Sequence, residues 1–538
     1  MAVFKRRWFM WDVARQRRFD RKEFLMVATK LSELGYNGIG LYLEGAFELK
    51  CLGGGILRKG VMTHEDAVWA REKCEELGLY LFPMTNVVGH MEHFMRQERF
   101  KYLCKDDNTR STNIAFTKPE AEEFVLKIIY EYLEAFDTDY IHIGGDEADL
   151  NDKTRPLYAD FLAGLCDKLI ADGIKTAIWN DLLCAHRELV APFNRDVEIF
   201  DWHYYGHRTQ SLEYFINEGF KTVVACPSDN SWNGFCAHQY MRPWRTDEDL
   251  IPVTPDEVEA LFVDMAKVGD PENLCGMLAH WEDYNGRDLW GQWSAFARAG
   301  LYMSGNFEAS TQDDDKIELA IFGRITPYTK IMHIIQDEIH AAFYPNFKHQ
   351  GHVGQTIPML FYKNSFVEKG SDFILREVDL LPDVVEPLNK IEKLLSEWNT
   401  ENDFELYCKT YLISVVDFIR STITLTSAFS KCNALYTQAA KIQFSDNKKA
   451  RELVLKFAEG FADTTKSIKQ YKVTLGEFID LAPHIANDLD RLDNSIEYTE
   501  RIYAFLSDFA SSDDFAEIPL PNFNFVVDYA VDKRVIAR

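Results

Sequence analysis

The chain has 538 residues, of which 46% are hydrophobic and 27% charged, and its formal net charge is -26 at pH 7. This length suggests about two or three domains, and the composition is that of a folded globular protein rather than a disordered one. The negative charge argues against nucleic acid or an anionic membrane surface as a partner.

The cysteines and the N-terminus indicate the compartment. The ten cysteines show no C-x-x-C spacing, and most have apolar neighbours, as at Cys166 and Cys226. We expect them to be reduced core residues, which is typical of the cytosol. The N-terminus lacks the apolar region and cleavage site of a signal peptide. No stretch approaches about 18 uninterrupted apolar residues, so we expect a cytoplasmic protein without a membrane span.

Short apolar runs alternate with amphipathic helical patterns through roughly the first 300 residues. The runs predict strands at 8–13, 38–43, 79–84, 140–143, 176–179, 197–202, 222–226 and 274–280. Asp20, the pair Thr63 and Asp66, and Pro119 are typical of helix starts between them. Eight strand–helix repeats predict an α/β fold, a (β/α)8 TIM barrel. A doubly wound sheet is the alternative, but it would need a glycine fingerprint after its first strand, and none is present.

The pattern changes beyond the acidic segment 311–315. Apolar residues recur there at steps of three and four, from Ile374 to Trp398 and again from Ile485 to Leu506. Pro382 and Pro387 should kink or interrupt the first of these stripes. We therefore expect a barrel at 1–310, followed by a mainly α-helical domain at 311–538. The helical stripes predict a core, and they could also form a homodimer surface.

The fourth predicted strand ends in the motif His142-Ile143-Gly144-Gly145-Asp146-Glu147. The glycines allow a sharp turn, and two carboxylates follow at once. Because the turn can aim neighbouring side chains differently, one acid can stay ionised while the other carries a proton. The alternative is that these acids only cap the next helix.

Polar and aromatic residues recur at the carboxyl ends of the predicted strands, where active sites of such barrels lie. Any single tryptophan there is more typical of a core. Four of them at four strand ends predict a carbohydrate site, because indole faces pack on sugar C–H faces and carboxylates accept hydrogen bonds from hydroxyls. The residues at these ends are Asp12, Glu44, Asn86, His90, Asp146, Glu147, Trp179, Asn180, Asp181, Asp201, Trp202, His203, Tyr204, Asp229, Trp232, Trp281, Glu282 and Asp283.

Other chemistries fit the sequence less well. His90, Glu92 and His93 lack the H-E-x-x-H spacing of a zinc site, so we expect no metal. No G-x-S-x-G motif indicates a serine nucleophile, and we expect no cofactor. His142 lies inside a strand and is expected to be a hydrogen-bond partner for its neighbours.

The motif at 142–147 resembles the H-x-G-G-D-E signature of glycoside hydrolase family 20, the β-N-acetylhexosaminidases. The first-strand segment R-R-W-F-M-W-D-V-A-R, the G-H of the third strand, the W-N-D of the fifth and the later tryptophans are similar to further family segments. Together they cover roughly residues 5–305. By these matches the resemblance assigns substrate binding to Arg7, His90, Trp179, Asp181, Trp202, Trp281 and Asp283.

The resemblance implies an exo-acting, retaining β-N-acetylhexosaminidase that removes terminal N-acetylglucosamine or N-acetylgalactosamine. In this family the 2-acetamido oxygen of the substrate attacks the anomeric carbon. Glu147 would be the general acid and base, and Asp146 would orient the acetamido group and stabilise the cationic intermediate. Two alternatives remain: a non-catalytic sugar-binding barrel, and a retaining glycosidase with Asp146 or Glu147 as its nucleophile.

The sequence departs from the family pattern in several places. Asn86 stands where the family usually has an aspartate. The loop after the seventh strand lacks the usual tyrosine for the acetamido carbonyl, and Trp232, Asn233 or Tyr204 are the candidates to replace it. The small α/β domain that commonly precedes the barrel has no counterpart, and neither has the helical C-terminal region. These departures affect substrate choice more than reaction type.

Overall fold

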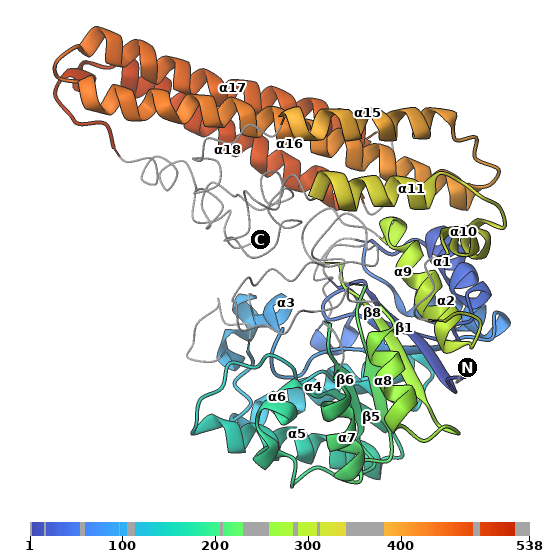
Figure 1. The fold of residues 1–538 in the computed structure, drawn as a ribbon. Helices are drawn as coiled ribbons and strands as arrows, with labels where there is room; N and C mark the ends of the chain where they lie inside the picture. Colours follow the sequence, from blue (N-terminus) through green and yellow to red (C-terminus); the bar gives the residue numbers. More distant parts are fainter. Residues whose placement is uncertain are drawn as a thin grey trace. The chain divides into compact units, whose positions relative to one another are not determined.

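The structure is a computed structural model that describes residues 3–14, 18–53, 60–95, 97–104, 113–204, 208–229, 258–282, 289–308, 313–340, 381–476 and 485–521. The chain divides into two compact units (Figure 1). The first comprises 1–230, 239–282 and 292–325, and the second comprises 231–238, 283–291 and 326–538.

The first unit contains a closed barrel of parallel strands that pair in chain order, with β1 hydrogen-bonded to both β2 and β8. This topology confirms the predicted (β/α)8 barrel, and every predicted strand is present. Their apolar, continuous sequences suit strands covered by helices outside and packed side chains inside. The strands are β1 (Arg6–Asp12), β2 (Gly38–Tyr42), β3 (Tyr80–Met84), β4 (Tyr140–His142), β5 (Lys175–Trp179), β6 (Glu198–Trp202), β7 (Val223–Cys226) and β8 (Cys275–His280).

The helices of the first unit begin at the predicted caps. The Asp20 side chain accepts from the Glu23 backbone N–H at 2.8 Å. Thr63 and Asp66 form a capping box, and Pro119 occupies the first turn of its helix. The helices are α1 (Arg21–Glu33), α2 (His64–Glu76), α3 (Glu92–Met95), α4 (Pro119–Phe136), α5 (Thr154–Ala171), α6 (Asp181–Ala185), α7 (Thr209–Asn217), α8 (Ala260–Val268), α9 (Trp293–Met303) and α10 (Asp314–Phe322), with short helices η1 (Lys50–Leu52), η2 (Glu98–Leu103) and η4 (Arg187–Leu189).

A packed plug fills the barrel at the amino ends of its strands. The Trp8 ring lies 4.7 Å from Phe82 and 5.3 Å from Tyr140 between ring centroids. Arg6 forms two hydrogen bonds with Glu198, at 2.6 and 2.8 Å, and its guanidinium lies over Trp8. This layer of aromatic and charged side chains fills the amino end of the barrel. A functional site is therefore expected at the carboxyl ends of the strands.

The second unit is helical in its described part and contains η6 (Leu289–Gly291), α11 (Tyr328–His333), the π-helix η7 (Ile334–His340), α15 (Leu381–Glu397), α16 (Asp403–Ile442), α17 (Asn447–Gly476), α18 (Ile485–Ser511) and η9 (Asp513–Ala516). The long helices α16, α17 and α18 pack side by side (Figure 1). This confirms the predicted helical C-terminal region.

The two predicted apolar stripes differ in how fully the structure describes them. In the first, Leu388, Ile391, Leu395 and Trp398 are buried, whereas Ile374 and Val378 lie outside the described residues. In the second, Leu492, Ile496 and Leu506 are buried, but Tyr503 is exposed.

The two prolines of the first stripe do not interrupt a helix, whereas a kink at either of them stays a prediction. The helix α15 begins at Leu381, so Pro382 lies in its first turn, where the missing N–H costs nothing. Pro387 lies inside α15, and the helix continues through it. Burial of Val384, Leu388 and Ile391 on one face offsets the single lost backbone hydrogen bond.

Two smaller expectations can be compared with the structure. Within the described ranges, no helix combines the length and the apolar character that a bilayer crossing requires. Six of the eight described cysteines are buried, whereas Cys184 is partly exposed and Cys51 is exposed, so the core interpretation fails for Cys51.

Candidate active site

The turn after β4 carries the two acids of the sequence motif. Gly144 and Gly145 have φ values of +71° and +97°, which only glycine adopts readily. A Cβ atom on Gly144 would lie 1.7 Å from Asn86 Oδ1, so a larger residue does not fit there. The Tyr158 hydroxyl, from α5, donates to the Gly145 carbonyl, and the Trp179 N–H donates to the Gly144 carbonyl at 3.0 Å. Neighbouring elements therefore hold this turn from two sides.

The turn places the two acids in different environments. Asp146 is 7% exposed, whereas the side chain of Glu147 is 59% exposed. Glu147 has a φ of +47°, a backbone conformation that costs strain for a residue with a side chain. The Glu147 backbone N–H donates to Asp181 Oδ2 at 3.0 Å. The motif therefore places a buried acid beside a solvent-facing one.

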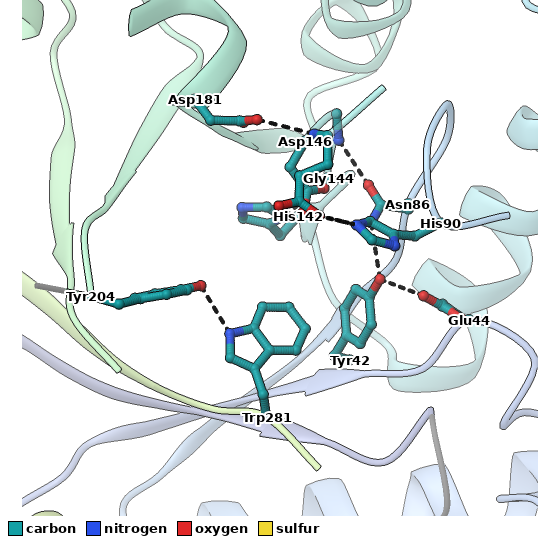
Figure 2. A network of polar contacts seen from close by, with 12 residues as sticks. Tyr42, Glu44, Asn86, His90, His142, Gly144, Asp146, Asp181, Tyr204 and Trp281 are labelled. Carbon is teal, nitrogen blue, oxygen red and sulfur yellow. Dashed lines mark hydrogen bonds and ion pairs between the residues drawn. The ribbon is translucent and has the colours of Figure 1, made fainter. Parts of the chain in front are cut away.

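His90, in the segment after β3, lies against both acids. Its Nε2 atom is 3.2 Å from Glu147 Oε2 and 3.7 Å from Asp146 Oδ2. His90 also has a positive φ, +48°. One imidazole thus links the buried carboxyl group to the exposed one, and it can hold both in place (Figure 2).

Burial and like charge raise the pKa of the acids around this turn. Burial is the main cause of the raised pKa of Asp146, the His90 charge opposes it, and the Glu147 charge adds to it. Burial and the nearby Asp146 charge raise the pKa of Asp181 to about 7. His142 packs 4.2 Å from Trp179, and burial lowers its pKa to about 3, so it is neutral. Its Nδ1 accepts from the Gly144 N–H at 3.1 Å, as expected for a hydrogen-bond partner.

Aromatic side chains from four strand ends form a wall beside the acids. The Trp281 ring lies 5.1 Å from Tyr42 and 6.2 Å from Trp179, and its Nε1 donates to the Tyr204 hydroxyl at 2.8 Å (Figure 2). Trp202 lies 4.8 Å from Tyr204. The charges of the two acids contribute to the raised pKa of Tyr204, after burial, so its hydroxyl lies within their field. The structure therefore gathers four predicted binding residues around the acid pair.

The structure does not bring Arg7 to this rim, which corrects the prediction that it binds sugar. Arg7 lies near the amino end of β1, five residues before Asp12, or about 16 Å along an extended strand. Its guanidinium donates to the Gly35 carbonyl at 2.6 Å and to the Phe4 carbonyl at 2.7 Å. Arg7 thus ties loops together at the opposite end of the barrel. Two further predicted residues, Trp232 and Asp283, lie outside the described residues.

A buried charged cluster supports the wall from behind. His280 Nδ1 lies 2.6 Å from Asp229 Oδ2, and its Nε2 lies 3.2 Å from Glu282 Oε1. The Glu282 backbone N–H donates to Asp12 Oδ2 at 3.1 Å. The two carboxylates raise the pKa of His280 to about 10 against the effect of burial. The cluster fixes the residues on both sides of Trp281. In the described ranges, no three His, Cys, Asp or Glu side chains are arranged to hold a metal ion.

The sequence analysis placed Glu44 at the end of the second strand but did not single out Tyr42, the last residue of β2. The Tyr42 hydroxyl donates to Glu44 Oε1 at 2.5 Å, and Glu44 Oε2 lies 2.7 Å from His93 Nδ1. One signal was present: Tyr42 lies only two residues before Glu44, which the sequence already placed at this strand end. Of the four non-glycine residues with positive φ in the described ranges, three are at this rim: Glu44, His90 and Glu147.

Comparison with known proteins finds similarity over part of the chain. Residues 83–232 match the model of glycosyl hydrolase family 20, catalytic domain. This part of the barrel is therefore similar to that catalytic domain. A lacto-N-biosidase from Bifidobacterium bifidum is 24% identical over 184 residues, which cover 30% of this chain and only 16% of that protein.

Two solved structures show limited similarity to this chain. A β-N-acetylhexosaminidase from Bacteroides fragilis has a TM-score of 0.46 at 19% identity, covering 59% of this chain and 69% of that chain. A family 20 β-N-acetylhexosaminidase from Streptomyces coelicolor has a TM-score of 0.44 at 17% identity, covering 60% of this chain and 68% of that chain.

Proposed function

We propose that the barrel is an exo-acting, retaining β-N-acetylhexosaminidase that works by substrate-assisted catalysis. The observation that carries this proposal is the contrast between Asp146 and Glu147. One carboxyl group is buried beside an aromatic wall, and its neighbour faces solvent while held by His90. This arrangement suits one group that orients a substrate and another that exchanges protons with it.

Glu147 is the proposed general acid and base. In the first step the acetamido oxygen of the substrate attacks the anomeric carbon as the glycosidic C–O bond breaks. Glu147 gives its proton to the leaving oxygen. In the second step water attacks the anomeric carbon, Glu147 takes a proton from it, and the acetamido group re-forms. Two displacements at one carbon retain its configuration. The 3.2 Å contact to His90 keeps the carboxyl group in one place through both steps.

Asp146 is the proposed partner of the acetamido group. Its carboxylate would accept a hydrogen bond from the acetamido N–H and stabilise the positive charge of the cyclic intermediate. Burial strengthens this interaction because little water screens it. Tyr204 is the proposed donor to the acetamido oxygen, since its hydroxyl lies in the field of both acids. Trp179, Trp202 and Trp281 would pack on the sugar and its methyl group.

Two substitutions test this assignment. Glu147→Gln and Asp146→Asn should each lower kcat on an aryl 2-acetamido-β-glycoside by about 100-fold or more. Azide should restore Glu147→Gln more than Asp146→Asn by attacking the intermediate. The control is Glu72→Gln, at an exposed position on α2, which should be fully active. Normal activity in Glu147→Gln would exclude the proposed acid, and a covalent sugar trapped on either acid would favour an enzyme nucleophile.

The substrate is best defined by a panel. Initial rates on aryl β-glycosides of N-acetylglucosamine, N-acetylgalactosamine and lacto-N-biose would separate single-sugar from disaccharide release. Binding of N-acetylglucosamine without turnover of any of these would favour a non-catalytic barrel. The predicted homodimer through the helical unit and the cytoplasmic location stay predictions, and light scattering and cell fractionation would test them.

A further inference from the structure

A chain of buried polar side chains runs from the end of β2 to the turn that carries the two acids. Asn86, buried in the segment after β3, forms hydrogen bonds both with this turn and with Tyr42, the last residue of β2. Its Oδ1 accepts from the Gly145 backbone N–H at 2.8 Å, and its Nδ2 donates to the Tyr42 hydroxyl at 2.9 Å. The Tyr42 hydroxyl in turn donates to Glu44 (Figure 2).

The donor and the acceptor of each hydrogen bond in this series of side chains follow from the chemistry of the groups. A backbone N–H can only donate, so the amide oxygen of Asn86 must face Gly145 and its NH2 group must face Tyr42. Because the Tyr42 oxygen accepts from Asn86, its single proton points to the Glu44 carboxylate. Glu44 is 1% exposed, and little water competes with hydrogen bonds between buried side chains, which strengthens the whole series.

Asn86 also fills the space beside the turn. Its Oδ1 atom lies where a Cβ of Gly144 would be, at 1.7 Å from the ideal Cβ position. The side chain thus contacts the turn at two successive residues, immediately before Asp146 and Glu147. If the amide rotated by half a turn, its NH2 group would face the Gly145 N–H, and two donors would meet. The orientation that Tyr42 and Glu44 impose on Asn86 is therefore the one that holds the turn.

We propose that Glu44, Tyr42 and Asn86 are positioning residues that lock the Gly144-Gly145 turn and so set the placement of Asp146 and Glu147. None of the three needs to touch the substrate. The expected effect on kcat rests on the function proposed above. The locking of the turn is a structural property that can be measured separately. Since displacements of about 1 Å can cost about 100-fold in rate, a loosened turn should lower kcat more than it changes KM.

The test compares Tyr42→Phe and Glu44→Gln with a matched control, Tyr36→Phe. Tyr36 is also buried, and its hydroxyl donates to the Phe296 carbonyl at 2.9 Å, outside the chain of interactions. Tyr42→Phe and Glu44→Gln should each lower kcat by about 10- to 100-fold with KM within about twofold. Tyr36→Phe should keep kcat within about twofold. The double variant should be no more than about twofold worse than the worse single variant, because both act through Asn86.

A second measurement separates this proposal from the proposed function. Hydrogen exchange of a peptide spanning 140–148, followed by mass spectrometry, should speed up at least about 10-fold in Tyr42→Phe and stay unchanged in Tyr36→Phe. If the wild type cleaves no β-N-acetylhexosaminide, the proposed function fails and the exchange result alone decides. Unchanged exchange in Tyr42→Phe, wild-type kcat in that variant, or multiplicative losses in the double variant would each overturn the proposal.

Discussion

Asp181 accepts a hydrogen bond from the backbone N–H of Glu147 at 3.0 Å, although burial and the Asp146 charge both disfavour its ionised form. The same carboxyl group thus anchors the acid turn and adds negative charge near it. Because the pKa of Asp181 is about 7, its charge changes in the pH range where the protein would work.

The first prediction concerns stability against pH. The folded-state pKa of Asp181 is raised from 3.8 to about 7, so the folded state holds a proton that the unfolded state loses first. The free energy of unfolding should therefore fall as pH rises from about 4 to 7, with Asp181 contributing about 4 kcal/mol of that fall. Asp181→Asn should flatten this part of the curve in urea titrations. An unchanged pH slope in this variant would show that Asp181 titrates normally.

The second prediction concerns His280, whose raised pKa reflects stabilisation of its charged form by neighbouring carboxylates. Asp229 and Glu282 raise its folded-state pKa to about 10, so the stabilisation is complete below the unfolded value of about 6.5 and is lost as pH rises through 10. His280→Gln should lower the free energy of unfolding at pH 7 by about 3 kcal/mol, because it leaves buried carboxylates without their cation. Thermal melts at pH 7 and pH 10 should differ less for the variant than for the wild type. A variant as stable as the wild type at pH 7 would contradict this.

The third prediction concerns Tyr204 and Trp281. Tyr204→Phe removes the acceptor for Trp281 Nε1 and the proposed donor to the acetamido oxygen. We expect kcat/KM to fall by about 10- to 100-fold on N-acetylated substrates, in line with the loss of one oxyanion donor. Tyr80→Phe, at the amino end of β3 and far along the barrel, is the matched control and should be fully active. Equal losses in both variants would indicate a general packing defect.

Much of the fold followed from the sequence. Within a repeated strand–helix pattern, a short continuous apolar run such as 38–43 predicts a buried strand. Helix caps such as Asp20 are local signals that can be recognised without knowledge of the tertiary structure. The aromatic residues at the strand ends were placed correctly because parallel strands share one carboxyl edge. Thus Trp179, Trp202 and Trp281 lie together although they are distant in sequence.

Other parts of the site could not be predicted, for physical reasons. Arg7 was misplaced because the resemblance assigned it a role, although the predicted strand 8–13 already left it at the amino end of the barrel. The contacts of Asn86 depend on a turn with positive φ values, where the alternation of strand side chains no longer holds. Tyr42 looked like a core aromatic, and only its hydroxyl partners show otherwise.

The most direct test of the central claim is one ratio of rates. An aryl 2-acetamido-β-glucoside and its 2-hydroxy parent differ only in the group proposed to act as nucleophile. If the substrate supplies that nucleophile, kcat/KM for the acetamido compound should exceed that for the parent by about 1,000-fold or more, and Asp146→Asn should reduce this ratio. Comparable kcat/KM values for the two glycosides would contradict substrate-assisted catalysis at Asp146 and Glu147.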